Sequence, residues 1–259
     1  MRESHNDASD EPLVAMLLAA GVGSRLRPLT DARPKCLVPV NGESFLHRAV
    51  RVIGARGIER FIIVTGYKRE AVHAALEGLA VDLRFVHSDA YDRTQNSVSM
   101  ALGARALGPG EACIKLDADV LFVPEVIDAL CARVRAAHAQ GTRPVGAVAV
   151  DAKQALGAEE MKLEVDSDRA VRFGKGLDPA RCAGESIGIE LFDAPAIALV
   201  REALERAMRQ GRTDLYYEDV YNDVLATLCM HPVPVGSGAW TEVDDLADLA
   251  RAERMFAKM

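Results

Sequence analysis

The sequence contains no apolar run close to the roughly 20 residues that a membrane-spanning helix needs. Residues 1–11 lack the basic start, apolar middle and cleavage site of a secretory signal and are expected to form a flexible tail. Lysine and arginine number 31 against 38 acidic residues, and the resulting formal charge of −7 argues against a broad nucleic-acid surface. These absences predict a cytoplasmic protein with neither a membrane nor a nucleic acid as partner.

Patterns typical of zinc sites and disulfide frameworks are also missing. The five cysteines are odd in number, widely spaced and without a Cys-x-x-Cys pair, which favours reduced packing residues. The six histidines include no His-Glu-x-x-His motif. A polyanionic substrate would therefore need a local basic site rather than zinc or a generally basic surface.

Apolar runs alternate with helical stripes along the chain, a pattern typical of α/β proteins. We expect a three-layer Rossmann-like α/β fold, with a mixed, mostly parallel central sheet and helices on both faces, in a single domain at 12–259. A polar turn between 162–165 and 170–173 predicts a hairpin within a lid region at about 155–235. Further strands are expected at 13–18, 61–64, 83–86, 112–116, 145–150, 187–192 and 233–235, and helices at 44–55, 69–79, 97–107, 124–138, 195–209, 218–228 and 245–257.

A glycine-rich loop follows the first predicted strand. Gly21 and Gly23 allow main-chain amides to approach an anion, and Arg25 and Lys35 can neutralise its charge. This loop lies at the carboxyl end of a parallel strand, where α/β sheets bind ligands. The alternative is a tight turn with solvated basic side chains. The dinucleotide fingerprint and the Walker loop are both excluded, because the third glycine and the Gly-Lys-Ser/Thr sequence are absent.

Acidic residues occur at two further places. Asp117 and Asp119 end the strand predicted at 112–116, and Glu242, Asp244 and Asp245 precede the last helix. Magnesium prefers hard oxygen ligands and usually takes one or two protein carboxylates. Either group could instead cap a helix or complete a turn.

The segment from Leu18 to Leu37 reads Leu-Ala-Ala-Gly-x-Gly-x-Arg-x-x-Pro-Leu-Thr-x-x-x-Pro-Lys-x-Leu, and it resembles the signature of the nucleotide-sugar pyrophosphorylase-like nucleotidyltransferases. With weaker landmarks the resemblance covers roughly 13–255. It implies that Lys35 bridges phosphates at the reacting centre, and that Asp119 and Asp244, with Glu242 as a further neighbour, hold Mg²⁺. The nucleotide-binding residues that it implies are Ala19, Ala20, Gly21, Gly23, Ser24, Arg25 and, as support, Asp117.

The sequence departs from the sugar enzymes at Arg93–Ser99, where Asn96 and Ser97 resemble the phosphocholine cytidylyltransferase branch. The resemblance implies that these two residues help to recognise cytosine, although both are also good helix caps. It further implies an acceptor site built from Lys175, with Lys162 as an alternative, and from Glu185, Tyr217 and Glu218. The aromatic and acidic residues would suit an ammonium group, or would simply pack and begin a helix.

The activity implied is transfer of CMP from CTP to a small phosphorylated or phosphonylated alcohol or amine, with release of pyrophosphate. Phosphocholine is the first acceptor to consider, followed by 2-aminoethylphosphonate and inositol 1-phosphate. One alternative is a sugar-1-phosphate nucleotidyltransferase that uses UTP, dTTP or GTP. The other is a non-catalytic nucleotide-sensing subunit, which predicts loss of the lysine or of the acidic residues. The sequence does not predict an oligomeric state.

Overall fold

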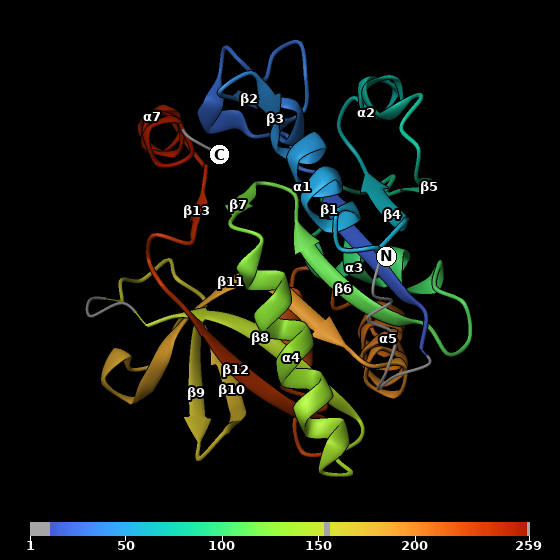
Figure 1. Cartoon of the computed structure of the whole chain (residues 1–259), viewed down its shortest axis with the longest axis vertical. Coiled ribbons are helices and arrows are strands. Elements are labelled where there is room, and N and C mark those ends of the chain that lie inside the picture. The colour runs from blue at the N-terminus through green and yellow to red at the C-terminus, as the bar shows by residue number, and fades with distance from the viewer. Residues whose placement is uncertain (1–10, 153–155, 258–259) are drawn as a thin grey trace, which may run out of the picture.

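The central feature of the computed structural model, which describes residues 11–152 and 156–257, is a nine-stranded sheet (Figure 1). Relative to β10 and β11, the other seven strands run in the opposite direction, so the sheet is mixed and mostly parallel, as the sequence predicts. The main path is β10 (Arg169–Gly174), β9 (Lys162–Asp166), β11 (Cys182–Phe192), β6 (Ala112–Asp117), β1 (Leu13–Ala19), β4 (Arg60–Thr65) and β5 (Asp82–His87). Off this path, β8 (Val145–Asp151) pairs with β11, and β12 (Cys229–Val235) pairs with β8.

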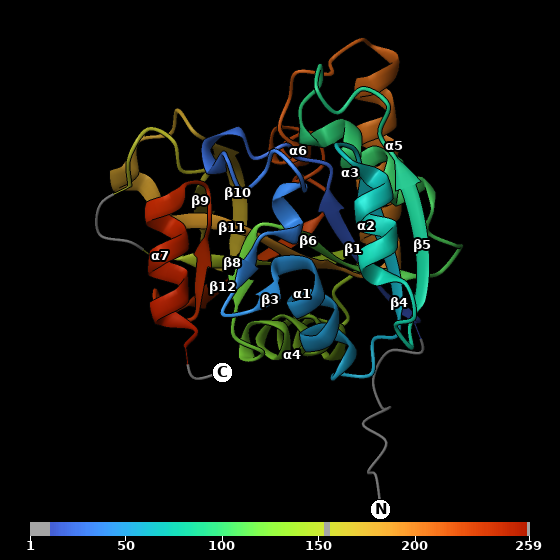
Figure 2. The same cartoon turned by 90° about the horizontal axis from the view of Figure 1, so that it is seen from above.

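Helices cover both faces of this sheet because successive side chains of a strand point to opposite faces. Ala15 and Leu17 of β1 pack in one core with α1 (Phe45–Gly54), α2 (Arg69–Leu76) and α4 (Glu125–Ala139). Val14 and Met16 pack in a second core with α3 (Asn96–Arg105), α5 (Ala194–Arg209) and α6 (Tyr217–Tyr221). Figure 2 shows α1 and α4 on one side of the strands and α5 and α6 on the other. The predicted three-layer arrangement is therefore confirmed.

A third, smaller core joins the loop after β1 to the C-terminal segment. Leu26 and Val38 contribute from the loop, Leu121 from the segment after β6, and Val243 and Phe256 from the end of the chain. The short elements around this core are η1 (Ser24–Leu26), η2 (Lys35–Leu37), β2 (Pro39–Val40), β3 (Glu43–Ser44), β7 (Val120–Phe122), β13 (Trp240–Glu242) and α7 (Leu246–Met255). This core packs the loop after β1, the segment after β6 and the C-terminal segment against one another.

Several predicted elements have the wrong length: β11 begins five residues before the strand expected at 187–192, and α2 ends three residues before the helix expected at 69–79. The helix expected at 218–228 ends at Tyr221, because the side-chain amide of Asn222 instead bonds the backbone N–H and C=O of Phe173, at 2.8 and 2.9 Å. The strand expected at 233–235 begins four residues earlier, at Cys229, and includes Pro232 and Pro234. Proline is tolerated there because an edge strand needs no N–H on its outer side.

The predicted tail at 1–11 lies outside the described residues except for Glu11, whose carboxylate accepts a hydrogen bond from the backbone N–H of Ala194 (3.0 Å). Across the described ranges, no helix is both long and apolar enough to cross a membrane.

Candidate active site

The two acidic groups meet because a pair of short strands joins them. β13 pairs with β7 in antiparallel register, with Glu242 opposite Val120, and the backbone N–H of Val243 donates to the carbonyl of Asp119 (3.3 Å). This pairing brings Asp119, Glu242 and Asp244 together at the carboxyl edge of the parallel strands. One carboxylate oxygen of each lies within 4.8 Å of the others.

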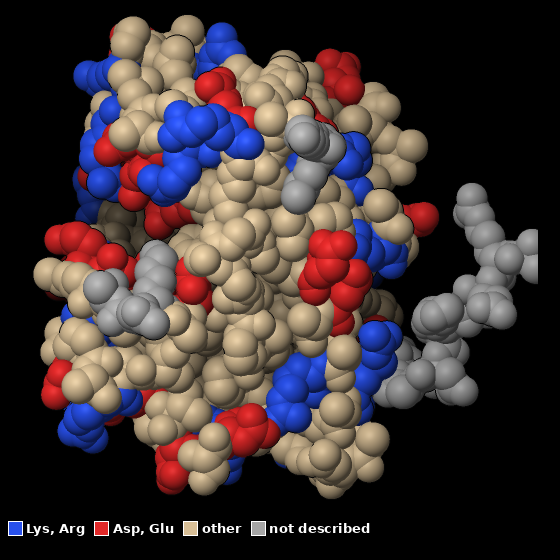
Figure 3. Space-filling model, turned by 60° about the vertical axis from the view of Figure 1, so that its left-hand side comes forward, with Lys and Arg blue, Asp and Glu red and all other residues tan. Residues whose placement is uncertain are grey.

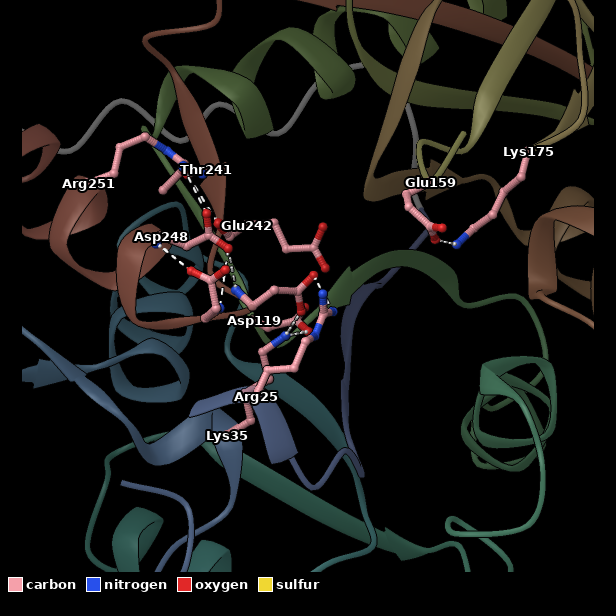
Figure 4. A network of polar contacts seen from close by, with 11 residues as sticks. Arg25, Lys35, Asp119, Glu159, Lys175, Thr241, Glu242, Asp248 and Arg251 are labelled. Atoms are coloured by element: carbon pink, nitrogen blue, oxygen red, sulfur yellow. Dashed lines mark hydrogen bonds and ion pairs between the residues drawn. The ribbon is translucent and has the colours of Figure 1, made fainter. Parts of the chain in front are cut away.

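The ammonium of Lys35 lies between two of these carboxylates. Its Nζ is 2.6 Å from Oδ2 of Asp119 and 2.6 Å from Oδ1 of Asp244, whose second oxygen pairs with Arg25 at 2.7 Å (Figure 4). Burial opposes the charged form of Lys35, but Asp119 and Asp244 outweigh it and raise the pKa above its ordinary value. Lys35 is therefore a fixed positive charge.

The acidic residues differ in their own charge state. Burial, together with the negative charges of Asp119 and Asp244, raises the pKa of Glu242 to about 8 and favours its neutral form. Burial also raises the pKa of Asp244, but Lys35 and Arg25 outweigh that effect, so its pKa is lowered overall. Carboxylate oxygens in this arrangement are hard ligands, and the donor set fits a divalent cation such as Mg²⁺.

Asp244 is available for the site because its neighbour caps the last helix. Oδ1 of Asp245 accepts hydrogen bonds from the backbone N–H groups of Ala247 and Asp248, at 2.8 and 2.9 Å, at the start of α7. The capping alternative raised by the sequence therefore applies to Asp245. It leaves the carboxylate of Asp244 facing Lys35.

Gly23 shapes the loop that carries Lys35. Its φ of 68° is in the left-handed region, and a Cβ at this position would lie 2.7 Å from the Cβ of Lys35. The hydroxyl of Thr30 donates to the carbonyl of Gly23 (2.8 Å) and fixes the loop. A Cβ at Gly21, by contrast, would meet no atom within 4 Å, so the surrounding protein does not require glycine there.

Two connected cavities open beside this cluster. The outer cleft has a volume of about 680 Å³, and a hollow flanked by charged side chains of both signs is visible on this side of the molecule (Figure 3). The inner pocket is smaller, at about 130 Å³. Residues that line both cavities are Glu159, Lys175, Glu185, Tyr216, Trp240 and Glu242. The cavities therefore share one wall and form a continuous site.

The two lysines expected at an acceptor site have different surroundings. Lys175 lies across open space from Lys35 and Asp119, with its Nζ 3.6 Å from Glu159 (Figure 4). Lys162 is 2% exposed, and its ammonium donates to the backbone carbonyls of Glu160 and Lys175. Lys175 can therefore reach a ligand in the cleft, whereas Lys162 supports the backbone that carries Lys175.

The predicted nucleotide residues lie in three segments: the end of β1 with the loop after it, the start of α3 and the end of β6. Ala19 and Ala20 are buried at the end of β1, whereas Ser24 is exposed in η1. Asn96 lines the inner pocket, and its Oδ1 accepts from the backbone N–H of Tyr217 (3.1 Å), so it caps α6 rather than its own helix. Ser97 beside it is 3% exposed.

A buried charged cluster beneath the inner pocket was not predicted. Lys115 of β6 and Glu190 of β11 are both 0% exposed and pair at 3.2 Å. Lys115 also pairs with Asp117 (3.1 Å), which accepts a hydrogen bond from the Tyr217 hydroxyl (2.5 Å). A Cβ on Gly188 would lie 2.6 Å from Asp117. In the sequence, Lys115 and Glu190 are the charged residues within the apolar runs predicted as strands at 112–116 and 187–192.

The sequence profile of the MobA-like NTP transferase domain matches residues 15–258. The chain belongs to this family. The resemblance on which the sequence prediction rested is thereby confirmed, and the chain is a nucleotidyltransferase. This assignment agrees with the position of Lys35, Asp119 and Asp244 at the carboxyl edge of the parallel strands.

Individual relatives of this MobA-like NTP transferase include two of similar length. It is 27% identical to the 2-aminoethylphosphonate cytidylyltransferase of Lancefieldella rimae, over 91% of this chain and 90% of the relative. It is 26% identical to the choline-phosphate cytidylyltransferase of Streptococcus pneumoniae, over 93% and 97% of the two chains. The inositol-1-phosphate CTP transferase of T. maritima has the same fold, with a TM-score of 0.78 at 21% identity over 97% of each chain.

In this NTP transferase, substituting Gly23→Ala should destabilise the loop that positions Lys35. The positive φ and the contact with the Lys35 side chain together predict a loss of about 1–3 kcal/mol in the free energy of unfolding. Gly21→Ala is the matched control, because its Cβ enters open space. Urea denaturation would measure both; equal effects of the two substitutions would contradict this account of the loop.

The Glu190 carboxyl predicts a pH dependence of stability. Burial raises its pKa from 4.5 to about 7, so the folded protein retains a proton that the unfolded chain releases in this range. Stability from this group is present below pH 4.5 and lost as the pH rises to 7. As the pH rises from 4.5 to 7.5, the free energy of unfolding of Glu190→Gln should therefore increase by about 2–3 kcal/mol relative to that of the wild type. Denaturation curves measured across this pH range test the prediction, with the exposed Glu202→Gln as control. Parallel pH profiles of stability for the wild type and Glu190→Gln would contradict it.

Proposed function

We propose that this chain transfers CMP from CTP to a small acceptor that carries a phosphate or phosphonate group, and releases pyrophosphate. The observation that carries the proposal is the Lys35 ammonium held 2.6 Å from both Asp119 and Asp244, beside a cleft that also contains Lys175. The names of the two relatives of similar length support CTP as the nucleotide. The Asn96–Ser97 segment supports the same choice.

The reaction is an in-line attack at phosphorus. An oxygen of the acceptor forms a bond to the α-phosphorus of CTP, and the bond from that phosphorus to the oxygen bridging to the β-phosphate breaks. A phosphate monoester has a second pKa of about 6, so it is already an anion near neutral pH and no general base is needed. Catalysis therefore consists of holding two anions together and neutralising charge.

The charged side chains can divide this work between them. Lys35 and Arg25, which follow β1, would contact the triphosphate, while Lys175 across the cleft would hold the acceptor's anionic group. The open space at Gly21 lets phosphate oxygens approach the backbone closely. Each cation thus reduces repulsion between the two substrates as they approach.

The carboxylates of Asp119 and Asp244, with Glu242 beside them, would hold Mg²⁺. When bound, this ion supplies a positive charge that neutralises phosphate oxygens and the charge that develops on them. Lys35 lies between the same carboxylates, so its ammonium would lie beside phosphate oxygens that such an ion binds.

The proposal is tested by measuring pyrophosphate from each of CTP, UTP, dTTP, GTP and ATP. Each nucleotide would be combined with Mg²⁺ and with phosphocholine, 2-aminoethylphosphonate, inositol 1-phosphate or glucose 1-phosphate. We expect release with CTP and an acceptor that carries an amine. Release only with UTP, dTTP or GTP and the sugar phosphate would replace this function with the sugar-nucleotide alternative, and no release with any pair would leave the non-catalytic alternative.

Asp119→Asn and Lys35→Met should each lower kcat at least about 100-fold, because each removes a charged group from the reacting centre. Circular dichroism should show a folded protein in both cases. Asp166→Asn, at an exposed hairpin position, is the matched control and should retain wild-type kcat. Near-normal turnover by Asp119→Asn would remove this carboxylate from the catalytic site.

A further inference from the structure

The floor of the inner pocket carries more negative than positive groups. Asp117 and Glu218 line the pocket, and Glu190 lies below them, whereas Lys115 is the cation that pairs directly with Asp117 and Glu190. Glu218 is 4% exposed, and Glu190 and Lys115 are fully buried. If all four groups are ionised, the cluster has a formal charge of 1 − 3 = −2. Such an excess is costly in a buried place unless protons or a bound cation offset it: burial raises the pKa of Glu190 to about 7 and that of Glu218 to about 8, and a cation bound in the pocket would favour their anionic forms.

Two polar atoms at the wall of this pocket have no hydrogen-bond partner among the described residues. They are Oε2 of Glu218 and Oγ of Ser186, and both residues line the pocket. Ser186 is 7% exposed. Buried polar atoms without a partner are rare in proteins, and beside a cavity they are candidates to accept a hydrogen bond from a bound ligand or water. A carboxylate and a hydroxyl together are acceptors for a group that donates hydrogen bonds.

The tyrosine rings are less suited to a cation than the sequence suggests. The Nζ of Lys115 lies 3.4 Å from the ring centroid of Tyr217, and the Nζ of Lys175 lies 4.6 Å from that of Tyr216. Each ring therefore already has a lysine over one face, and Tyr217 is only 1% exposed. A quaternary ammonium has no N–H and depends on aromatic faces, whereas a primary ammonium has three donors.

We propose that the inner pocket selects an acceptor with a primary ammonium group, which donates hydrogen bonds to Glu218 and Ser186. Lys175 lines the same pocket and would hold the phosphate or phosphonate at the other end of the acceptor. The acceptor class is thus a short ω-amino phosphonate or the phosphate ester of a short amino alcohol. This inference rests on the proposed function and changes the sequence-based preference for phosphocholine.

A methylation series on the acceptor nitrogen tests the selection in the wild-type protein. Phosphoethanolamine, its N-methyl and N,N-dimethyl derivatives and phosphocholine would be compared by pyrophosphate release with CTP. We expect kcat/KM to fall along the series by at least about tenfold in total, because each methyl group removes one donor. Phosphocholine turned over as well as or better than phosphoethanolamine would overturn the inference but leave the proposed function standing. No turnover of this series would overturn the inference, and no turnover of any acceptor in the wider panel either would overturn the proposed function as well.

Glu218→Gln tests the residue itself. The KM for 2-aminoethylphosphonate should rise about 10- to 100-fold while the KM for CTP stays unchanged, since the negative charge on the group that accepts from the ammonium is lost. 2-Hydroxyethylphosphonate has a neutral hydroxyl in place of the ammonium group. It distinguishes recognition of the ammonium from a structural effect of the substitution, because its kcat/KM should change less than about threefold. A parallel loss for both acceptors would overturn the role of Glu218.

Two further variants complete the test. Ser186→Ala should raise the KM for 2-aminoethylphosphonate by about three- to tenfold, and it provides an independent test if Glu218→Gln fails to fold. Glu202→Gln, on the exposed face of α5, should leave the KM for every substrate unchanged. Unchanged selectivity between amine and hydroxyl acceptors in Ser186→Ala would remove this hydroxyl from the recognition site.

Discussion

The ammonium of Lys35, held 2.6 Å from both Asp119 and Asp244, is the interaction on which the site depends. It joins three segments that are far apart in the sequence: the loop after β1, the end of β6 and the strand β13. An uncompensated charge in a place as buried as that of Lys35 would be strongly unfavourable. The small core around Leu26 and Val243 packs the same segments together, so charge pairing and apolar packing maintain one geometry.

The charge of the whole molecule contrasts with that of the site. A net charge of −7 repels a nucleoside triphosphate at long range, so under the proposed function binding would depend on the local cations Arg25, Lys35 and Lys175. Lys175 lies across open space from Arg25 and Lys35 (Figure 4), while the carboxylates of Asp119 and Asp244 lie directly beside Lys35. The site can thus receive two anionic substrates and separately accommodate a positive group on one of them.

Much of the fold could be predicted from the sequence because local patterns determine it. The alternation of Val14, Ala15, Met16 and Leu17 between two cores makes β1 a strand that is buried on both faces, and the sequence shows it as a continuous apolar run. The glycine-rich segment could be recognised because Gly21, Gly23, Arg25 and Lys35 belong to one continuous motif. The MobA-like family assignment confirms the family resemblance that was drawn from this motif.

The remaining features depend on pairings between distant parts of the chain. β7 and β13 have three residues each, too few to show a period, yet their pairing brings Glu242 and Asp244 to Asp119. The lengths of α6 and β12 depend on a side-chain bond from Asn222 and on an edge position in the sheet. Lys115 and Glu190 were visible as charges in apolar strands, but only the register of β6 with β11 makes them a pair.

The central claim is that Asp119 helps to hold a divalent cation against the triphosphate in the presence of Lys35. Electron paramagnetic resonance of Mn²⁺ titrated into the protein with CTP measures this directly, because free and protein-bound ions give different spectra. The account predicts a protein-bound Mn²⁺–CTP signal in the wild type that is weakened at least about tenfold in affinity by Asp119→Asn. The same signal and affinity in the folded Asp119→Asn variant would contradict it.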